Sequence, residues 1–315
     1  KENIYDLDSL KLNTDGTSVK IRGLLAIEGI NNSASENFAY ELVLTDENTN
    51  QNYTIALQRW TDSSEYPYDI NAIPNNSYDY SGAWFQGDLD FNNIPNGNYQ
   101  VTLIAKNATY YTTQGLTNTY SKNIAQRFTN SAGTGIEFRT NFLLKKMPLE
   151  VFIRTQGLIT TETKPTIDNA FIEYSKLSLN AGLIDIKGSA YNVNGDYSAS
   201  GSVSRTIIFE NTSTYERTSY DVGSITTGDY AIVLRVNDGY DKTRAWYHAS
   251  LDLTKLGPGT YNIYVKTTSA NGLSDYGELT DVFCRSLPEP VTYNGKTYTL
   301  KLVTNQRYQI TLTVE

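Results

Sequence analysis

A chain of 315 residues is too long for one small core and suits two domains of ordinary size. Its 25 Tyr stand against 10 Phe, 3 Trp, one Met and one Cys, a composition that favours an all-β chain. The net charge of −8 leaves neither half with a basic footprint for nucleic acid, and the single Cys excludes an internal disulfide framework. No run approaches the roughly 20 apolar residues that span a bilayer, so we expect no membrane insertion.

Four stretches of the first half recur in the same order in the second half, which indicates an internal duplication. The chain predicts two copies of one unit, residues 1–158 and 168–315, joined through the Thr-rich stretch 155–169. The matching pairs are IYDLDSLKLN (4–13) with FIEYSKLSLN (171–180), VKIRG (19–23) with IDIKG (184–188), AWFQGDLDFNNIPNGNYQV (83–101) with AWYHASLDLTKLGPGTYNI (245–263), and GIEFRTNFLLKKMPLEVFI (135–153) with GKTYTLKLVTNQRYQITLT (295–313).

Within each copy, apolar residues alternate with polar ones, as in Val19 and Ile21 or Val101 and Leu103. No segment carries the apolar stripe of a helix. Short strands separated by turns such as PNGN and VNGD indicate antiparallel sandwiches. The predicted fold is therefore all-β, with two tandem antiparallel immunoglobulin-like β-sandwiches.

The recurring stretch 83–101 begins with a strand whose two faces differ. Phe85, Leu89 and Phe91 fall on one face and form the expected core, whereas Trp84 points to the other. Trp246 takes the matching outward place in the second copy. An outward Trp in both copies would suit a ligand or subunit surface. The alternative is a Trp covered by a loop or displaced by a bulge, which agrees with the usual burial of Trp.

The same stretch ends with an aliphatic residue, a Pro/Gly turn, and a Tyr two residues before a core aliphatic. This arrangement is typical of the tyrosine corner of immunoglobulin-like sandwiches, whose hydroxyl bonds to backbone a few residues upstream. Tyr99 and Tyr261 are therefore predicted to be structural. Val101 and Ile263 stand where antibody domains carry a Cys.

A further group of aromatics surrounds EYPYDINAIPNNSYDYSG, the least alternating part of the first copy. Aromatics mixed with polar residues in a loop suit carbohydrate or peptide-like ligands if they are exposed. The alternative is a loop that folds back and buries them as a satellite cluster. The candidates are Trp60, Tyr66, Tyr68, Tyr78 and Tyr80.

Catalytic and metal-binding patterns are weak throughout the chain. His248 is the only His, and Cys284 lies at strand spacing that predicts a buried thiol rather than its partner. Asp88 and Asp90 share a strand face, as a glycosidase acid pair would, but a solvated sheet face explains them equally well. The Asp-rich turn 237–241 lacks a calcium-loop pattern, and one His with one Cys cannot build an ordinary zinc site. We therefore expect no metal and no cofactor.

The pattern W-[FY]-x-x-x-L-D-[FL]-x-x-[IL]-x-x-G-x-Y, present twice, resembles Ig-like accessory modules of cell-surface and cell-wall-modifying proteins of low-GC Gram-positive bacteria. The resemblance implies an extracellular or wall-associated location and a module that binds wall polymers, self-associates or spaces a catalytic domain. Three hypotheses follow: a non-enzymatic module that binds a wall or host glycan through exposed aromatics, a structural or oligomerising module, and, more distantly, a glycoside hydrolase on a sandwich scaffold.

Overall fold

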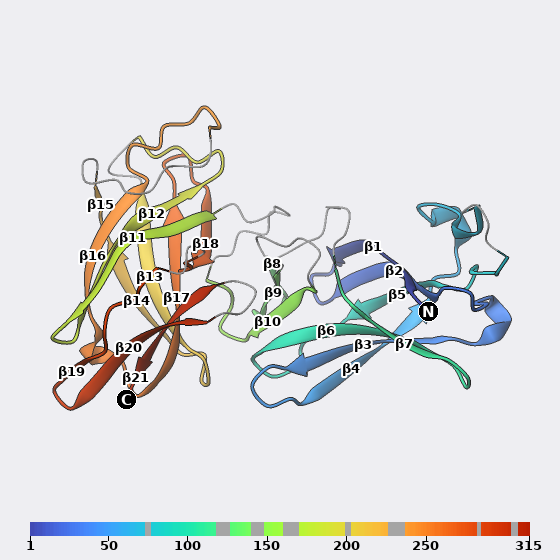
Figure 1. Ribbon diagram of the computed structural model, residues 1–315. Helices are drawn as coiled ribbons and strands as arrows, with labels where there is room; N and C mark the ends of the chain where they lie inside the picture. The colour runs from blue at the N-terminus through green and yellow to red at the C-terminus, as the bar shows by residue number, and fades with distance from the viewer. Residues whose placement is uncertain are drawn as a thin grey trace. The chain divides into compact units, whose positions relative to one another are not determined.

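The structure is a computed structural model that describes residues 1–72, 77–117, 127–139, 148–159, 170–198, 203–225, 237–281, 285–303 and 308–315 (Figure 1). The chain divides into two compact units, Lys1–Thr166 and Ile167–Glu315, here called unit 1 and unit 2. The division falls inside the Thr-rich stretch 155–169. Among the described residues, the helices are short 3-10 turns, none long enough to cross a membrane.

Unit 1 is an antiparallel sandwich in which β1, β2 and β5 form one layer and β4, β3, β6 and β7 form the other. These orders correspond to strands A-B-E and C′-C-F-G of an immunoglobulin-like domain. The last residues of β4 also pair with β5, so that the two layers join at one corner. The elements are β1 (Asn3–Leu12), β2 (Val19–Ile27), η1 (Ala34–Glu36), β3 (Ala39–Asp46), β4 (Asn52–Arg59), η2 (Ser63–Glu65), η3 (Ile70–Ala72), β5 (Trp84–Leu89), β6 (Gly97–Lys106), β7 (Tyr111–Gly115), β8 (Arg127–Thr129), β9 (Gly135–Arg139) and β10 (Glu150–Arg154).

Unit 2 repeats this topology in two separate sheets. One sheet has the order β11-β12-β16-β15, equivalent to A-B-E-D, and the other contains β14-β13-β17 with β18 beside β17, equivalent to C′-C-F-G. The fold is therefore all-β, with two immunoglobulin-like sandwiches in tandem. Its elements are β11 (Ala170–Asn180), β12 (Leu183–Asn192), β13 (Ser204–Asn211), β14 (Arg217–Val222), β15 (Ser224–Ile225), β16 (Trp246–Asp252), η4 (Leu253–Lys255), β17 (Gly259–Thr268), β18 (Ser274–Glu278), β19 (Val291–Tyr293), β20 (Lys296–Val303) and β21 (Gln309–Val314).

Both units split the last sandwich strand, G, into two halves. In unit 1, β7 pairs with the second half of β6 and β10 with the first half, and the Leu149 amide donates to the Leu116 carbonyl where the halves meet. In unit 2, β18 and β21 divide β17 in the same way, with Ile310 donating to Leu279. The residues between the half-strands include β8–β9 or β19–β20, which extend the sheet beyond strand G.

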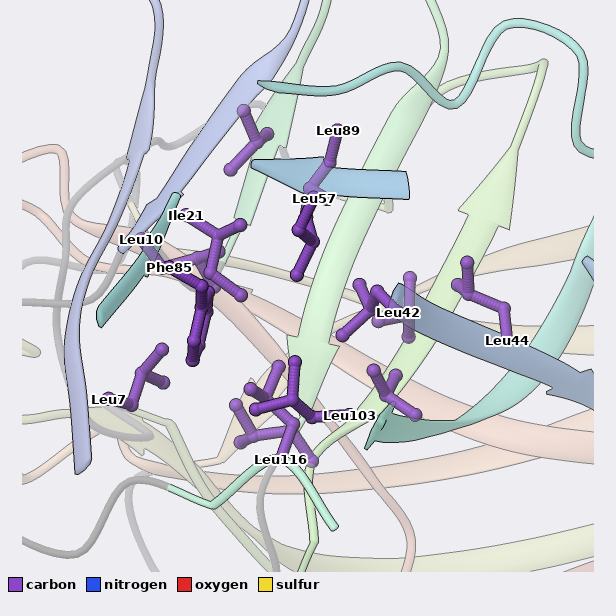
Figure 2. Close-up of a cluster of buried hydrophobic side chains, with 14 of the residues drawn as sticks. Leu7, Leu10, Ile21, Leu42, Leu44, Leu57, Phe85, Leu89, Leu103 and Leu116 are labelled. Atoms are coloured by element: carbon purple, nitrogen blue, oxygen red, sulfur yellow. The ribbon is translucent and has the colours of Figure 1, made fainter. Parts of the chain in front are cut away.

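The core of each unit lies between its two layers, on the faces that the alternation predicts. Figure 2 shows the core of unit 1, where Phe85 and Leu89 of β5 lie with leucines of the opposite layer. Phe85, Leu89 and Phe91 are buried, as predicted. Tyr247, Ala249, Leu251 and Leu253 form the matching part of the core of unit 2.

The predicted alignment of the last repeated segment is wrong in register. Val151 pairs with Tyr99, and Leu312 pairs with Tyr261, so Val151 is equivalent to Leu312 rather than to Thr311. The preceding strand is displaced by two residues, because Phe138 pairs with Val151 while Leu300 pairs with Leu312. The sequence match did not account for the different lengths of the inserted hairpins.

Candidate functional site

Trp84 does point away from the main core, as the alternation predicts, but it is only 1 % exposed. It packs in a second apolar cluster on the outer face of the β1-β2-β5 layer, together with Trp60, Ile70 and Tyr80. The segment between β4 and β5 supplies these residues and covers the strand. The prediction of Trp84 as a surface binding residue is therefore wrong, and the alternative of a Trp covered by a loop is the one observed.

The aromatic cluster of unit 1 is tightly organised. The Trp84 ring stacks on Tyr66, with 5.1 Å between centroids, and Trp60 meets both rings edge-on at 5.6 and 5.1 Å. The Trp60 amide donates to the Trp84 carbonyl at 2.9 Å, and the Tyr66 hydroxyl donates to the Trp60 carbonyl at 2.5 Å. Trp60 and Tyr80 are buried, so these two also cannot contact a ligand at the surface.

A charged pair borders the cluster on the sheet side. The Arg22 guanidinium lies 4.5 Å from the centroid of the Trp60 ring, and its Nη2 lies 2.9 Å from Glu65 Oε2. Cross-strand pairing places Arg22 opposite Gln86 on the same face of the sheet. This border is polar and partly solvated, since the Arg22 side chain is 26 % exposed and that of Glu65 is 50 % exposed.

Two of the predicted aromatics remain at the surface. Tyr68 is 42 % exposed while its ring still contacts Trp84, with 5.2 Å between centroids. Tyr78 is 44 % exposed and lies beside Gly29, where a Cβ would be 3.7 Å from the Tyr78 ring. The loop therefore divides its aromatics between a buried base of Trp60, Tyr80 and Trp84 and an exposed pair, with Tyr66 half-buried between them.

Trp246 occupies the matching place in unit 2 and is 7 % exposed. Its neighbour Ala245 is buried with Tyr191 and Tyr197 in a cluster outside the main core. The prediction of Trp246 as an exposed contact residue is therefore wrong as well.

Both predicted tyrosine corners show the expected hydrogen bond. The Tyr99 hydroxyl donates to the Pro95 carbonyl at 2.6 Å, and the Tyr261 hydroxyl donates to the Gly257 carbonyl at 2.8 Å. The glycine two residues before each Tyr is required by close approach. A Cβ on Gly97 would lie 2.7 Å from Asp46 Oδ2, and one on Gly259 would lie 2.6 Å from Asn211 Nδ2.

The single His and the candidate acids occupy structural positions. His248 Nε2 lies 2.8 Å from Asp185 Oδ1, a cross-strand pair between the neighbouring strands β16 and β12 on a partly exposed face. Asp88 accepts a hydrogen bond from Asn13, and Asp90 accepts one from the Asn92 amide in the following turn. Cys284 lies outside the described residues.

In the Asp-rich turn 237–241, Asp238 is paired with an amine from its own segment and Asp241 accepts from Thr243. The Asp238 carboxylate lies 3.0 Å from Lys242 Nζ and also accepts from the Asn194 amide. Where the chain is described, no three His, Cys, Asp or Glu side chains come together as a metal site would require.

Comparisons with known proteins do not place the chain in a family. The chain matches no described protein family and no curated protein sequence. Among solved structures it is similar to a tetra-tandem repeat in the extending region of a large adhesion protein, with 10 % identity, 89 % of this chain and 75 % of that chain covered, and a TM-score of 0.21. It is also similar to the FN1–FN3 domains of chicken CNTN1, with 11 % identity, 94 % and 71 % coverage, and a TM-score of 0.18. At these TM-scores neither likeness carries an argument about this chain.

Proposed function

We propose that the chain is a non-catalytic extracellular recognition module of a cell-surface or wall-associated protein, and that unit 1 binds a glycan at the loop between β4 and β5. The observation that carries this proposal is the pair Tyr68 and Tyr78, which stay exposed although the same loop buries Trp60, Tyr80 and Trp84. An amphipathic ring on a rigid base offers a flat apolar face for a sugar and a hydroxyl for hydrogen bonding, at low cost in side-chain entropy.

The polar groups around these rings support a sugar ligand. Glu65 and Arg22 border the cluster, and Asp69 and Asp79 lie in the same loop with exposed side chains. A few oriented polar groups beside aromatic faces are typical of small-ligand sites.

Titration calorimetry of the full chain with wall and host oligosaccharides tests the proposal. We expect saturable binding that the double substitution Tyr68→Ala/Tyr78→Ala weakens at least about tenfold, which corresponds to about 1.4 kcal/mol. Tyr240→Ala is the matched control, because Tyr240 is 47 % exposed but belongs to unit 2. Equal loss in both variants, or no glycan binding at all, contradicts the proposal.

A second candidate function is a spacer. It is favoured by the repetition of one architecture, since both units split strand G, insert a hairpin between its halves and end on the second half-strand. Sedimentation velocity separates this role from self-association: a monomer over a wide concentration range, together with no glycan binding, supports the spacer.

A further inference from the structure

The exposed tyrosines of unit 1 extend beyond the β4–β5 loop. Tyr110 and Tyr111, at the turn between β6 and β7, are 39 % and 63 % exposed. With Tyr68 and Tyr78 they make up four of the eight large hydrophobic side chains that are exposed in the described part of the chain. All four belong to the end of unit 1 where the β2–β3, β4–β5 and β6–β7 connections meet. This loop end comprises residues 28–38, 60–72, 77–83 and 107–111 (Figure 1).

Hydrogen bonds tie the three connections of the loop end together. The Asn107 side chain donates to the Glu36 carbonyl at 3.0 Å, which joins the β6–β7 turn to the β2–β3 loop. The Asn32 amide donates to the Asp79 carbonyl at 2.7 Å, and the Gly29 amide donates to the Tyr80 hydroxyl at 2.9 Å, which join that loop to the β4–β5 connection. Because the loops are held before a ligand arrives, little ordering entropy is lost on binding.

The loop end is also acidic. Its residues include six carboxylates and no Lys, Arg or His, and five of the six side chains are exposed. The Ser64 hydroxyl and amide hold the pKa of Asp62 below its usual range, and the Ser81 amide and hydroxyl do the same for Asp79, so both are ionised at neutral pH. The six are Glu28, Glu36, Asp62, Glu65, Asp69 and Asp79.

Four cations flank this end, and each is held by a particular group of the loop end or of the sheet beside it. Arg22 binds Glu65, and Lys106 binds Glu41. Lys1 and Arg59 donate to the carbonyls of Gly29 and Ala34. Of the six carboxylates of the loop end, Glu65 forms an ion pair with one of these four cations, and most of the others are exposed to solvent.

Unit 2 does not repeat this combination. Its turn equivalent to the β6–β7 connection reads SANGL, residues 269–273, with no aromatic residue. Among the described residues at the equivalent end of unit 2, the one large exposed aromatic side chain is Tyr240. Its ring centroid lies 5.5 Å from Lys242 Nζ. The acidic, Tyr-rich surface thus belongs to unit 1 alone among the described residues.

We propose that the loop end of unit 1 binds a polysaccharide that carries free ammonium groups, with the faces of Tyr68, Tyr78, Tyr110 and Tyr111 stacking on sugar rings. The inference rests on the proposed function and adds the charge of the ligand and the extent of the surface. Tyr faces attract cations as well as sugar C–H groups, and exposed carboxylates steer a positively charged polymer toward them. A ligand bound along three connections is an extended polymer rather than a single sugar.

The test compares a glucosamine oligomer with its fully N-acetylated form of the same length, titrated into the full chain in mildly acidic buffer. The two probes share their sugar rings and differ in charge. We expect the glucosamine oligomer to bind at least about tenfold more tightly, and this difference to shrink as added salt screens the charges. The double substitution Glu28→Gln/Asp69→Asn should also reduce the difference in affinity between the two oligomers, because it removes two negative charges while keeping hydrogen-bonding side chains of similar size. Glu216→Gln in unit 2 is the matched control.

Tyr111→Ala tests the extent of the surface and should weaken binding of the glucosamine oligomer several-fold, whereas Tyr240→Ala should not. Equal affinities for the two oligomers overturn the charge inference and leave the proposed function standing. Binding that is insensitive to Tyr111→Ala overturns the extended surface. Failure of both oligomers and of every other glycan overturns the inference and the proposed function together.

Discussion

Tyr40 of unit 1 and Arg205 of unit 2 occupy the same position of the third sandwich strand and perform the same task with different chemistry. Tyr40 pairs with Ala105, and Arg205 pairs with Thr267. Ala105 and Thr267 each lie six residues after the corner Tyr of their own unit. The Tyr40 hydroxyl donates to the Gly82 carbonyl, and the Arg205 guanidinium donates to the carbonyls of Ala190 and Arg244. Both side chains donate hydrogen bonds to backbone carbonyls inside the fold, where an unmade hydrogen bond is costly.

Replacement of Arg205 should destabilise unit 2 despite the removal of a buried charge. Burial lowers the pKa of Arg205 to about 10, so the folded protein penalises its charge. Arg205→Met would nevertheless remove the guanidinium donors of the Arg244 and Ala190 carbonyls and leave the Ala190 carbonyl with the Thr267 hydroxyl. Unsatisfied buried groups cost about 1–3 kcal/mol each, and relief of the buried charge offsets part of this. We expect a net loss of about 1–3 kcal/mol, read from hydrogen exchange in urea, with peptides of unit 1 unchanged. Equal or greater stability of unit 2 would contradict this account.

The two tyrosine corners should contribute similarly and independently. Tyr99→Phe and Tyr261→Phe each remove one hydroxyl that donates to a backbone carbonyl four residues upstream. Each should lower the unfolding free energy of its own unit by about 1 kcal/mol, since the ring stays in place and only a neutral hydrogen bond is lost. The double variant should show additive losses in peptide-resolved exchange, and a loss that spreads to the other unit would be the contrary result.

Local signals in the sequence were sufficient to predict the core-facing strands, the internal duplication and the two tyrosine corners. Alternation placed Phe85 and Leu89 in the core, and the Pro/Gly-x-Tyr pattern predicted hydrogen bonds whose partners are only four residues apart. The split of strand G has no such signal, because two half-strands of about five residues look like members of separate hairpins. The register of β10 was missed for the same reason, since a short strand without a fixed turn can be aligned one residue out.

The sequence indicated which aromatic residues belong to the candidate site, but not which of them are buried and which are exposed. Alternation states which face of β5 carries Trp84, but not what covers that face. The covering residues 60–72 and 77–83 show no periodicity in the sequence, so their packing depends on long-range contacts such as the stacking of Tyr66 on Trp84. Tyr110 and Tyr111 are adjacent in the sequence, but the hydrogen bond from Asn107 to the Glu36 carbonyl, which joins their turn to the β2–β3 loop, follows only from the fold.

Trp84→Ala should be strongly destabilising rather than merely reducing affinity for a ligand. The side chain is 1 % exposed and contacts three other aromatic rings, and truncation of a buried Trp costs about 3–5 kcal/mol. Amide exchange should accelerate most in residues 61–72 and 77–83, which lose their apolar base. Tyr111→Ala is the control at an exposed aromatic and should change stability by less than about 0.5 kcal/mol. A folded, fully stable Trp84→Ala protein would refute the buried position.

The stability of unit 1 should depend on Glu137 at acidic pH. Glu137 is buried, and its Oε1 lies 3.0 Å from Arg127 Nε and 3.1 Å from Arg139 Nε. Burial alone would raise the pKa of this carboxyl, but the charges of Arg139 and Arg127 outweigh it and hold the pKa below its usual range. A carboxyl whose pKa is lower in the folded state stabilises the protein above the unfolded pKa, and this stabilisation is lost as the pH falls toward the folded value.

The urea midpoint of unit 1 should therefore fall as the pH drops below the ordinary range of a Glu carboxyl. Glu137→Gln should remove that part of the pH dependence and should cost about 3–5 kcal/mol at neutral pH, because two largely buried guanidinium groups lose their shared carboxylate. Glu36→Gln, at a half-buried carboxyl elsewhere in unit 1, is the matched control. If Glu137→Gln leaves the pH profile of unit 1 unchanged, Glu137 does not carry the acid sensitivity, and other carboxylates of the unit must supply it.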